Sequence, residues 1–353
     1  MISFNDHAVG ALAFTVTWTR DGLRHEERFT GRKFNPVNDI FPTGMRDALE
    51  GKRAGESVTL TYEPRLCIPR HRESRVLRLS LDRLRKKTVR GEPIIPRFGR
   101  FYPQGHIDGL LDVYPDTLTP FRLIELADDA FTADLNHPLA EDTVTISAQI
   151  QYMERRDTGT YGSLTHWRET ICDWGPGMQA RHGGVPTDFF LPGFFDRPAE
   201  GDPAPPRLDR RALENVEAIR ARCIEPGMHV LDFSPGAPLP SGRHDAAFAL
   251  HGPEYAADPF TLFSAVADRL PVGAPVVVAF GNRPDATRAI QGWTSLHEFE
   301  RMGLVLEYLR RAGLDRNAGT VSMRNDWRAE DDPRFLETRA VSDSVFAVYG
   351  HKR

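Results

Sequence analysis

The sequence predicts two folded parts in series, a β-rich α+β module over residues 1–152 and an α/β domain over residues 211–353, joined by an irregular arm over residues 153–210. Three observations support this prediction. Residues 144–152 alternate apolar and polar side chains, which is typical of a strand with one buried face. Residues 275–280 form a continuous apolar run of the kind that parallel sheets bury on both faces. The arm combines aromatic residues with Gly and Pro and has no clean periodicity.

The composition is that of a globular protein: the 353 residues are 40% apolar and 27% charged, with a formal net charge of -4. No apolar run reaches the ~18 residues that a membrane span requires, and the first residues do not resemble a secretory signal. Cys67, Cys172 and Cys223 are too isolated for a CxxC pair or a disulfide framework. We therefore expect a cytoplasmic protein.

The N-terminal part is expected to be mostly β-strand. A short helix is predicted over residues 44–50, because Gly51 follows a helical pattern at a C-cap position. A second β group over residues 121–134 ends at the turn signal Asn136-His137-Pro138. The remaining predicted strands cover residues 11–18, 57–62 and 144–152.

One stretch is strongly basic in a chain whose pI of about 6.3 is not. Residues 65–100 hold twelve Arg or Lys residues against three acidic ones, a net charge of +9, which leaves -13 for the remainder. Leu77, Leu79 and Leu81 alternate with polar residues and predict a strand with one face in the core and one in water. Three interpretations of the basic stretch stay open: a solvated strand face, a protein-docking surface or a nucleic-acid contact.

The C-terminal part predicts strands that alternate with helices. Phe260, Phe263, Val266 and Leu270 recur at helical spacing, which indicates an amphipathic helix. The predicted helices cover residues 212–223, 258–270 and 296–312, and the predicted strands cover residues 228–233, 245–250, 275–280 and 345–349. The aromatic residues of the arm are too many for a free linker, so we expect the arm to pack across a domain surface. They are Trp167, Trp174, Phe189, Phe190, Phe194 and Phe195.

Two segments of the N-terminal part resemble the FKBP-type peptidyl-prolyl isomerases, specifically the bacterial SlyD-like branch with a chaperone insert. Residues 41–56, Phe-Pro-Thr-Gly-Met-Arg-Asp-Ala-Leu-Glu-Gly-Lys-Arg-Ala-Gly-Glu, resemble the central helix of that family and the turn after it. Residues 134–150, which begin Asp-Leu-Asn-His-Pro-Leu-Ala, resemble the place where the insert returns to the barrel. The resemblance implies an FKBP/SlyD-like module with an inserted subdomain over about residues 70–140.

The same resemblance implies a shallow apolar basin for a prolyl ring and puts Phe41, Pro42 and Met45 on it. Pro42 stands where the family uses a backbone N–H to hold the substrate carbonyl, and proline has none. We therefore expect peptide binding with poor isomerisation, while Phe41 and Met45 also fit plain core positions. The expected chaperone surface of the insert consists of Phe98, Phe101, Tyr102, Ile107, Leu110 and Tyr114.

Several segments of the C-terminal half resemble class I S-adenosylmethionine (SAM)-dependent methyltransferases. Residues 230–236, Val-Leu-Asp-Phe-Ser-Pro-Gly, resemble the end of the first strand and the cofactor loop. Residues 244–249 resemble the fourth strand, and residues 258–283 resemble the next helix, turn and fifth strand. Residues 176–181 and 186–190 resemble the aromatic linker of bacterial proteins that join the same two modules. The resemblance implies an α/β Rossmann-like methyltransferase-type domain.

The cofactor half of that domain is too short in this sequence. It requires a Gly-rich turn, a helix and a second strand that ends in an acidic residue about 20 residues on. Phe233 and Asp245 are only twelve positions apart, so the first helix and the adenine-side strands cannot fit between them. We therefore expect a degenerate domain without cofactor; if SAM were retained, Asp232, Gly236 and Asp258 would bind it.

Together these features predict a folding or assembly factor that binds a client polypeptide through the FKBP/SlyD-like module. The methyltransferase-like domain would serve as a docking scaffold. Two alternatives stay open: an active peptidyl-prolyl isomerase, and a SAM-dependent methyltransferase that acts on a bound protein or small molecule. The expected partner is a client protein, acidic if the basic stretch docks it, and we expect no nucleic acid, membrane or cofactor. A metal site is not expected either, because the twelve histidines lack close ligand spacing.

Overall fold

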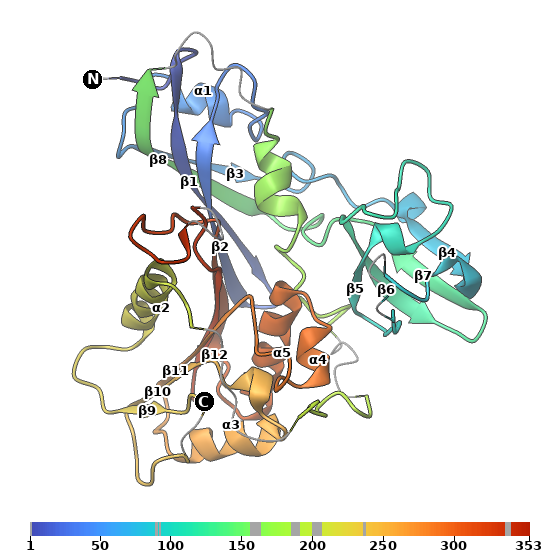
Figure 1. Ribbon diagram of the computed structural model, residues 1–353, viewed down its shortest axis with the longest axis vertical. Coiled ribbons are helices and arrows are strands. Elements are labelled where there is room, and N and C mark those ends of the chain that lie inside the picture. The colour runs from blue at the N-terminus through green and yellow to red at the C-terminus, as the bar shows by residue number, and fades with distance from the viewer. Residues whose placement is uncertain are drawn as a thin grey trace.

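The computed structural model describes residues 2–88, 91, 93–155, 164–184, 191–199, 207–235, 238–335 and 340–353. Its main feature is one nine-stranded mixed sheet in the order β3-β8-β1-β2-β12-β13-β11-β10-β9, to which both parts of the chain contribute. In Figure 1 this sheet runs from the N-terminal part at the top to the C-terminal part at the bottom, and a four-stranded sheet projects to one side. The architecture is mixed α/β.

The N-terminal part contributes four strands and one short helix to this architecture. Leu12, Phe14 and Val16 alternate along β1 and are fully buried, as the period-two pattern predicts. The short helix α1 begins after Gly44, whose φ of 75° favours glycine, and buries Met45 against the sheet. The elements are β1 (Ala8–Arg20), β2 (Leu23–Phe34), α1 (Met45–Leu49), β3 (Ser57–Tyr62) and β8 (Val144–Arg155).

The four-stranded sheet, in the order β4-β7-β6-β5, lies between β3 and β8 in the sequence. We call residues 70–140 the insert. Leu77, Leu79 and Leu81 are half-buried against its core of Phe121, Phe131 and neighbouring residues, whereas Arg78 is exposed, which confirms the alternation predicted here. The strands are β4 (Val76–Ser80), β5 (Phe101–Pro103), β6 (Pro120–Leu126) and β7 (Ala130–Asp134), with 3-10 turns η1 (Glu73–Arg75), η2 (Leu81–Arg83) and η3 (Gln104–His106).

The C-terminal part contributes five strands. β9, β10 and β11 are parallel neighbours, and β13 lies antiparallel between β11 and β12. The predicted strands and helices of this part are all present, and β12 and the short helix α4 are additions. The elements are α2 (Arg210–Cys223), β9 (Val230–Asp232), β10 (Ala246–Leu250), η5 (Pro253–Tyr255), α3 (Pro259–Asp268), β11 (Pro275–Gly281), α4 (Gln291–Thr294), α5 (Glu298–Arg311), β12 (Arg316–Arg324) and β13 (Val345–His351).

Both faces of this half of the sheet are buried. Successive residues of β11 belong to different cores: Val277 packs with α2 on one face, and Val276 and Val278 pack with α3 and α5 on the other. All seven residues of β11 are buried, as the continuous apolar run predicts. No helix or strand occurs among the described residues between β9 and β10, so the short spacing after Phe233 leaves room for a loop alone.

The two parts of the chain are joined by parallel pairing of β2 with β12, so the expected boundary at residue 152 does not divide the sheet. Buried polar side chains accompany this pairing. Glu27 is fully buried; it accepts a short hydrogen bond from Ser322 and one from Arg324 Nε at 2.6 Å. His25 Nδ1 lies 2.8 Å from Thr320 Oγ1. Neither strand is predicted from the sequence, because their buried polar residues hide the pattern of a buried strand.

The described residues of the arm pack onto the folded parts, as expected. Trp167 packs against Phe14 with the two rings tilted and their centroids 5.4 Å apart, and its indole N–H donates to Asp39 Oδ2 at 2.9 Å. A π-helical turn, η4 (Glu169–Asp173), follows, and Phe194 is buried in the core of the C-terminal part. Phe189 and Phe190 lie outside the described residues.

Within the described ranges, every helix falls short of the length and apolar character that crossing a bilayer demands. The same residues hold no group of three or more His, Cys, Asp or Glu side chains that could bind a metal ion.

Candidate binding cleft

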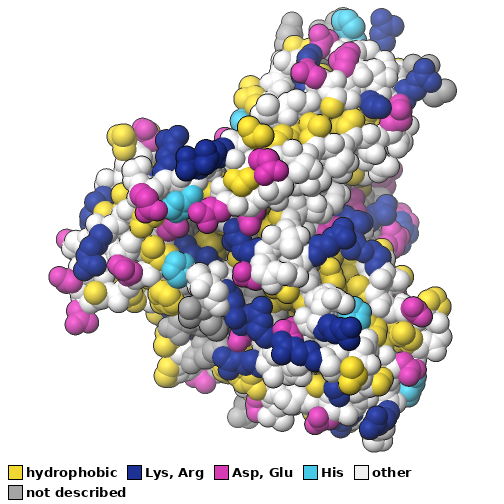
Figure 2. Space-filling model, turned by 180° about the vertical axis from the view of Figure 1, so that it is seen from behind, with side chains coloured by type: hydrophobic (Ala, Val, Ile, Leu, Met, Phe, Trp, Pro, Cys, Tyr) yellow, Lys and Arg dark blue, Asp and Glu magenta, His cyan; other side chains and the backbone are white. Residues whose placement is uncertain are grey.

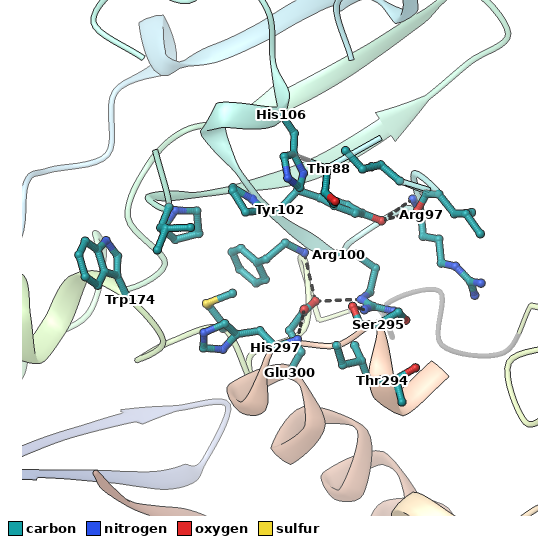
Figure 3. A pocket seen from close by; sticks show the side chains of 18 of the residues that line it. Thr88, Arg97, Arg100, Tyr102, His106, Trp174, Thr294, Ser295, His297 and Glu300 are labelled. Carbon is teal, nitrogen blue, oxygen red and sulfur yellow. Dashed lines mark hydrogen bonds and ion pairs between the residues drawn. The ribbon is translucent and has the colours of Figure 1, made fainter. Parts of the chain in front are cut away.

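A cleft of about 440 Å³ lies between the insert and the start of helix α5 (Figure 3). β5 and its flanking loops form one wall, and the segment that enters α5 forms the other. The arm adds Trp174 and Met178. We call this cavity the cleft; its apolar lining residues are Ile94, Ile95, Phe101, Tyr102, Leu118, Met178, Trp174 and Leu296, together with Pro93, Pro103 and Pro120.

A buried ion pair connects the two walls of the cleft. Arg100 Nε donates to Glu300 Oε1 at 2.9 Å, and the backbone N–H of Phe101 donates to the same oxygen at 3.1 Å. Each side chain of the pair is only 3% exposed. Glu300 Oε2 also accepts from the backbone N–H of His297 at 3.2 Å, which caps α5. Since these groups are bound to one another, the pair holds the walls together.

The outer part of the cleft presents apolar side chains to solvent. Ile95 is 59% exposed, Leu118 61% and Trp174 49%. Exposed apolar side chains that border a cavity are typical of sites that bind other molecules.

Polar groups are also present among the lining residues. The Tyr102 hydroxyl donates to the Ile95 carbonyl and accepts from the Arg97 N–H, each at 2.9 Å, and burial raises the pKa of Tyr102 to about 12. Burial lowers the pKa of His106. Within the described part of the chain, the buried atoms His106 Nδ1 and Arg97 Nη1 have no hydrogen-bond partner.

The residues predicted for a prolyl basin lie elsewhere. Met45 is fully buried and Pro42 is buried, while Phe41 is half-buried with its ring edge-on to Phe4 at 6.0 Å. Met45 belongs to the core beneath β1 and β8, and Phe41 packs against it. In this conformation Met45 has no surface that a peptide could touch.

The six residues predicted for a chaperone surface are divided by the structure. Phe101 and Tyr102 line the cleft, whereas Ile107 is buried in the core of the insert. Tyr114 is 67% exposed; the side chains of Phe98 and Leu110 are half-buried. Phe98 packs edge-on against His182 of the arm, with ring centroids 5.6 Å apart.

Asp232 and Asp258, two of the residues predicted to bind SAM, form hydrogen bonds with neighbouring residues of the chain. Asp232 Oδ1 accepts from the Ser234 N–H at 2.9 Å and holds the turn after β9. Asp258 is the N-cap of α3, where it accepts from the N–H and hydroxyl of Thr261 at 3.0 and 2.6 Å. Gly236 lies outside the described residues. A hollow of about 500 Å³, lined by Asp232 and His251, lies at the carboxyl ends of β9 and β10.

The wall of the cleft that precedes α5 is not predicted from the sequence. Its residues Thr294 to Glu300 are almost 200 positions away from Arg100, and no local pattern relates them. The one available signal was the spacing of His297 and Glu300, which is that of a capping box, but this predicts a helix start and not a site.

No protein-family model matches the chain, and no curated protein matches it. Among solved structures, the crystal structure of the small RNA methyltransferase HEN1 aligns with 99% of this chain at 9% sequence identity and a TM-score of 0.23. This chain spans 40% of that protein. So low a TM-score does not establish a shared fold. The likeness of residues 1–152 to FKBP-type isomerases stays a prediction.

Proposed function

We propose that this protein binds a client polypeptide as a folding or assembly factor, and that apolar side chains of the client enter the cleft. The observation that carries this proposal is the cleft itself: an apolar cavity of about 440 Å³ with exposed apolar side chains at its outer part. A cavity of this size accommodates one or two large apolar side chains of an extended chain. Such a site recognises unfolded segments with little sequence specificity.

We propose that the N-terminal part has an FKBP/SlyD-like origin. Its support is the position of α1 against the sheet, with the insert lying between β3 and β8 as the resemblance implies. The burial of Met45 and the missing N–H of Pro42 both oppose a working prolyl site. Binding, rather than isomerisation, is therefore the proposed activity.

The C-terminal part is proposed to be a methyltransferase-like scaffold without SAM. In support, β9 is the edge strand and β10, which resembles the fourth strand of the family, pairs directly with it. The strands expected on the adenine side have no place in the described sheet. Ligands of open α/β sheets bind at the carboxyl ends of the strands, where the hollow beside Asp232 remains, so a SAM-dependent methyltransferase is the second candidate.

The test uses reduced, carbamidomethylated α-lactalbumin as a permanently unfolded probe, with binding measured by fluorescence anisotropy. We expect Leu118→Asp, at the outer part of the cleft, to weaken binding about tenfold or more. The matched control is Val272→Asp: this valine is 71% exposed, like Leu118 at 61%, but lies in the turn between α3 and β11. Equal affinities of the two variants, or no binding by the wild type, would overturn the proposal.

A further inference from the structure

A second cavity, of about 300 Å³, adjoins the cleft, because Pro120 lines both. We call it the basic pocket. Arg70, Arg72 and Arg75 line it together with Arg168 and His137, and Asp173 is the acidic residue among its described lining. On one face of the molecule, Lys and Arg side chains gather on the insert near the N-terminal part of the sheet (Figure 2).

The backbone that carries these arginines is held in place. Asn136 Oδ1 accepts from the Arg72 N–H at 2.9 Å, and Asn136 Nδ2 donates to the Arg72 carbonyl at 3.1 Å. The Leu135 N–H donates to the Arg75 carbonyl at 3.0 Å. The Asn136-His137-Pro138 turn therefore fixes the η1 segment before any ligand binds, which reduces the entropy cost of binding.

Three of the four arginines that line the basic pocket are not neutralised by a carboxylate of the described residues, whereas the fourth, Arg168, is paired with Asp173. Arg70, Arg72 and Arg75 are exposed, and none of them forms an ion pair with a carboxylate of the described residues. The charge of Asp173 is already balanced by Arg168, whose Nη1 donates to Asp173 Oδ1 at 3.0 Å.

Other arginines of the same basic stretch do have acidic partners. Three ion pairs show this: Arg78 with Glu125, Arg85 with Asp108 and Arg100 with Glu300. The stretch thus contains ion-paired arginines as well as the triplet Arg70, Arg72 and Arg75, which lines the basic pocket without a carboxylate partner among the described residues.

We infer that the basic pocket binds acidic side chains of the client polypeptide whose apolar side chains enter the cleft. Guanidinium groups bind carboxylates through paired hydrogen bonds, and three unpaired ones attract an acidic segment at long range. A polypeptide is favoured over a nucleic acid, because the adjoining cleft offers aliphatic groups such as Ile95 and Leu118, which contact apolar side chains. This inference rests on the proposed function.

The experiment compares two probes made from one unfolded chain. The first is reduced, carbamidomethylated α-lactalbumin, which is acidic, and the second is the same chain with its carboxyl groups converted to amides. The test variant is the triple Arg70→Gln, Arg72→Gln, Arg75→Gln. The control is the triple Arg53→Gln, Arg243→Gln, Arg316→Gln, which changes the net charge equally at exposed positions elsewhere.

We expect the test triple to lose about tenfold in affinity for the acidic probe and to bind the amidated probe like the wild type. The control triple should stay within about twofold of the wild type on both probes. If the test triple keeps wild-type affinity for the acidic probe while Leu118→Asp loses it, the inference fails and the proposed function stands.

Two further outcomes would also overturn the inference. If the wild type binds neither probe, both this inference and the proposed function fail. If single-stranded oligouridylate binds the wild type, loses affinity in the test triple and is not displaced by the acidic probe, the basic pocket is a nucleic-acid site.

Discussion

Removing one partner of the buried Arg100–Glu300 pair should loosen the insert from helix α5. In Glu300→Ala the Arg100 charge stays buried without its carboxylate, and the N–H groups of Phe101 and His297 lose their acceptors. Both side chains of the pair are 3% exposed, so the pair belongs to the class in which loss of one partner costs about 3–5 kcal/mol. We therefore expect Glu300→Ala to lower the free energy that holds the insert against α5 by about 3–5 kcal/mol.

Hydrogen exchange measured by mass spectrometry checks this locally. If the insert opens from α5 as a unit, exchange of the cleft amides other than those of Phe101 and His297, whose acceptor the variant removes, should accelerate roughly a hundred- to several thousandfold, since about 1.4 kcal/mol corresponds to a factor of ten. The matched control is Glu125→Ala, which removes the partner of Arg78 in a pair whose side chains are 62% and 67% exposed. Its effect should stay within about 1 kcal/mol.

A double variant separates the ion pair from the packing around it. Arg100→Met with Glu300→Met replaces both charges by apolar groups, and such replacements of buried pairs are often near neutral. We expect the double variant to be more stable than Glu300→Ala. If Glu300→Ala loses no more stability than Glu125→Ala, the pair does not hold the two walls of the cleft together, and the reasoning is refuted.

Three further predictions follow from other parts of the structure. Burial lowers the pKa of His137 to about 4 from about 6.5 in the unfolded chain, so below pH 6.5 the unfolded chain binds the extra proton and the native state loses stability. The stability of the wild type relative to His137→Gln should therefore fall by about 3 kcal/mol between pH 7 and pH 4, measured by urea unfolding; a constant difference would contradict the buried neutral imidazole. Gly31→Ala would bring a methyl group to 2.8 Å from the Trp167 ring and should lower the free energy of unfolding by about 1–3 kcal/mol in the same urea assay. An unchanged urea midpoint would show instead that Trp167 and the arm move aside without loss of stability. Calorimetric titration with SAM should show no binding at micromolar concentrations, and cofactor carried through purification would disprove this.

The fold was predictable from sequence where one local pattern decides it. Val144 to Ile150 alternate and Val276 to Val278 are uniformly apolar, so β8 and β11 follow from periodicity alone. β2 and β12 do not, because their buried residues include His25, Glu27 and Ser322. These polar groups satisfy one another across the two strands, and neither sequence segment shows its partner.

The candidate site was less predictable than the fold. The apolar character of the insert predicts Phe101 and Tyr102 as surface residues for binding, and both line the cleft. The cavity also requires Trp174 from the arm and Glu300 from α5, and only the tertiary fold brings these together. Arg70 to Arg75 stood out by charge, but the distinction between paired and unpaired arginines needs side-chain positions.

The pairing of β2 with β12 has a consequence for synthesis on the ribosome. His25 and Thr320, which face each other there, are 295 residues apart, so at about 5–20 residues per second β2 waits roughly 15–60 s for its neighbour. During that time β2 is an unprotected edge strand, with backbone N–H and C=O groups open to pairing with another chain. We therefore expect that a holding chaperone, or low expression that keeps nascent chains apart, reduces aggregation before β12 emerges from the ribosome.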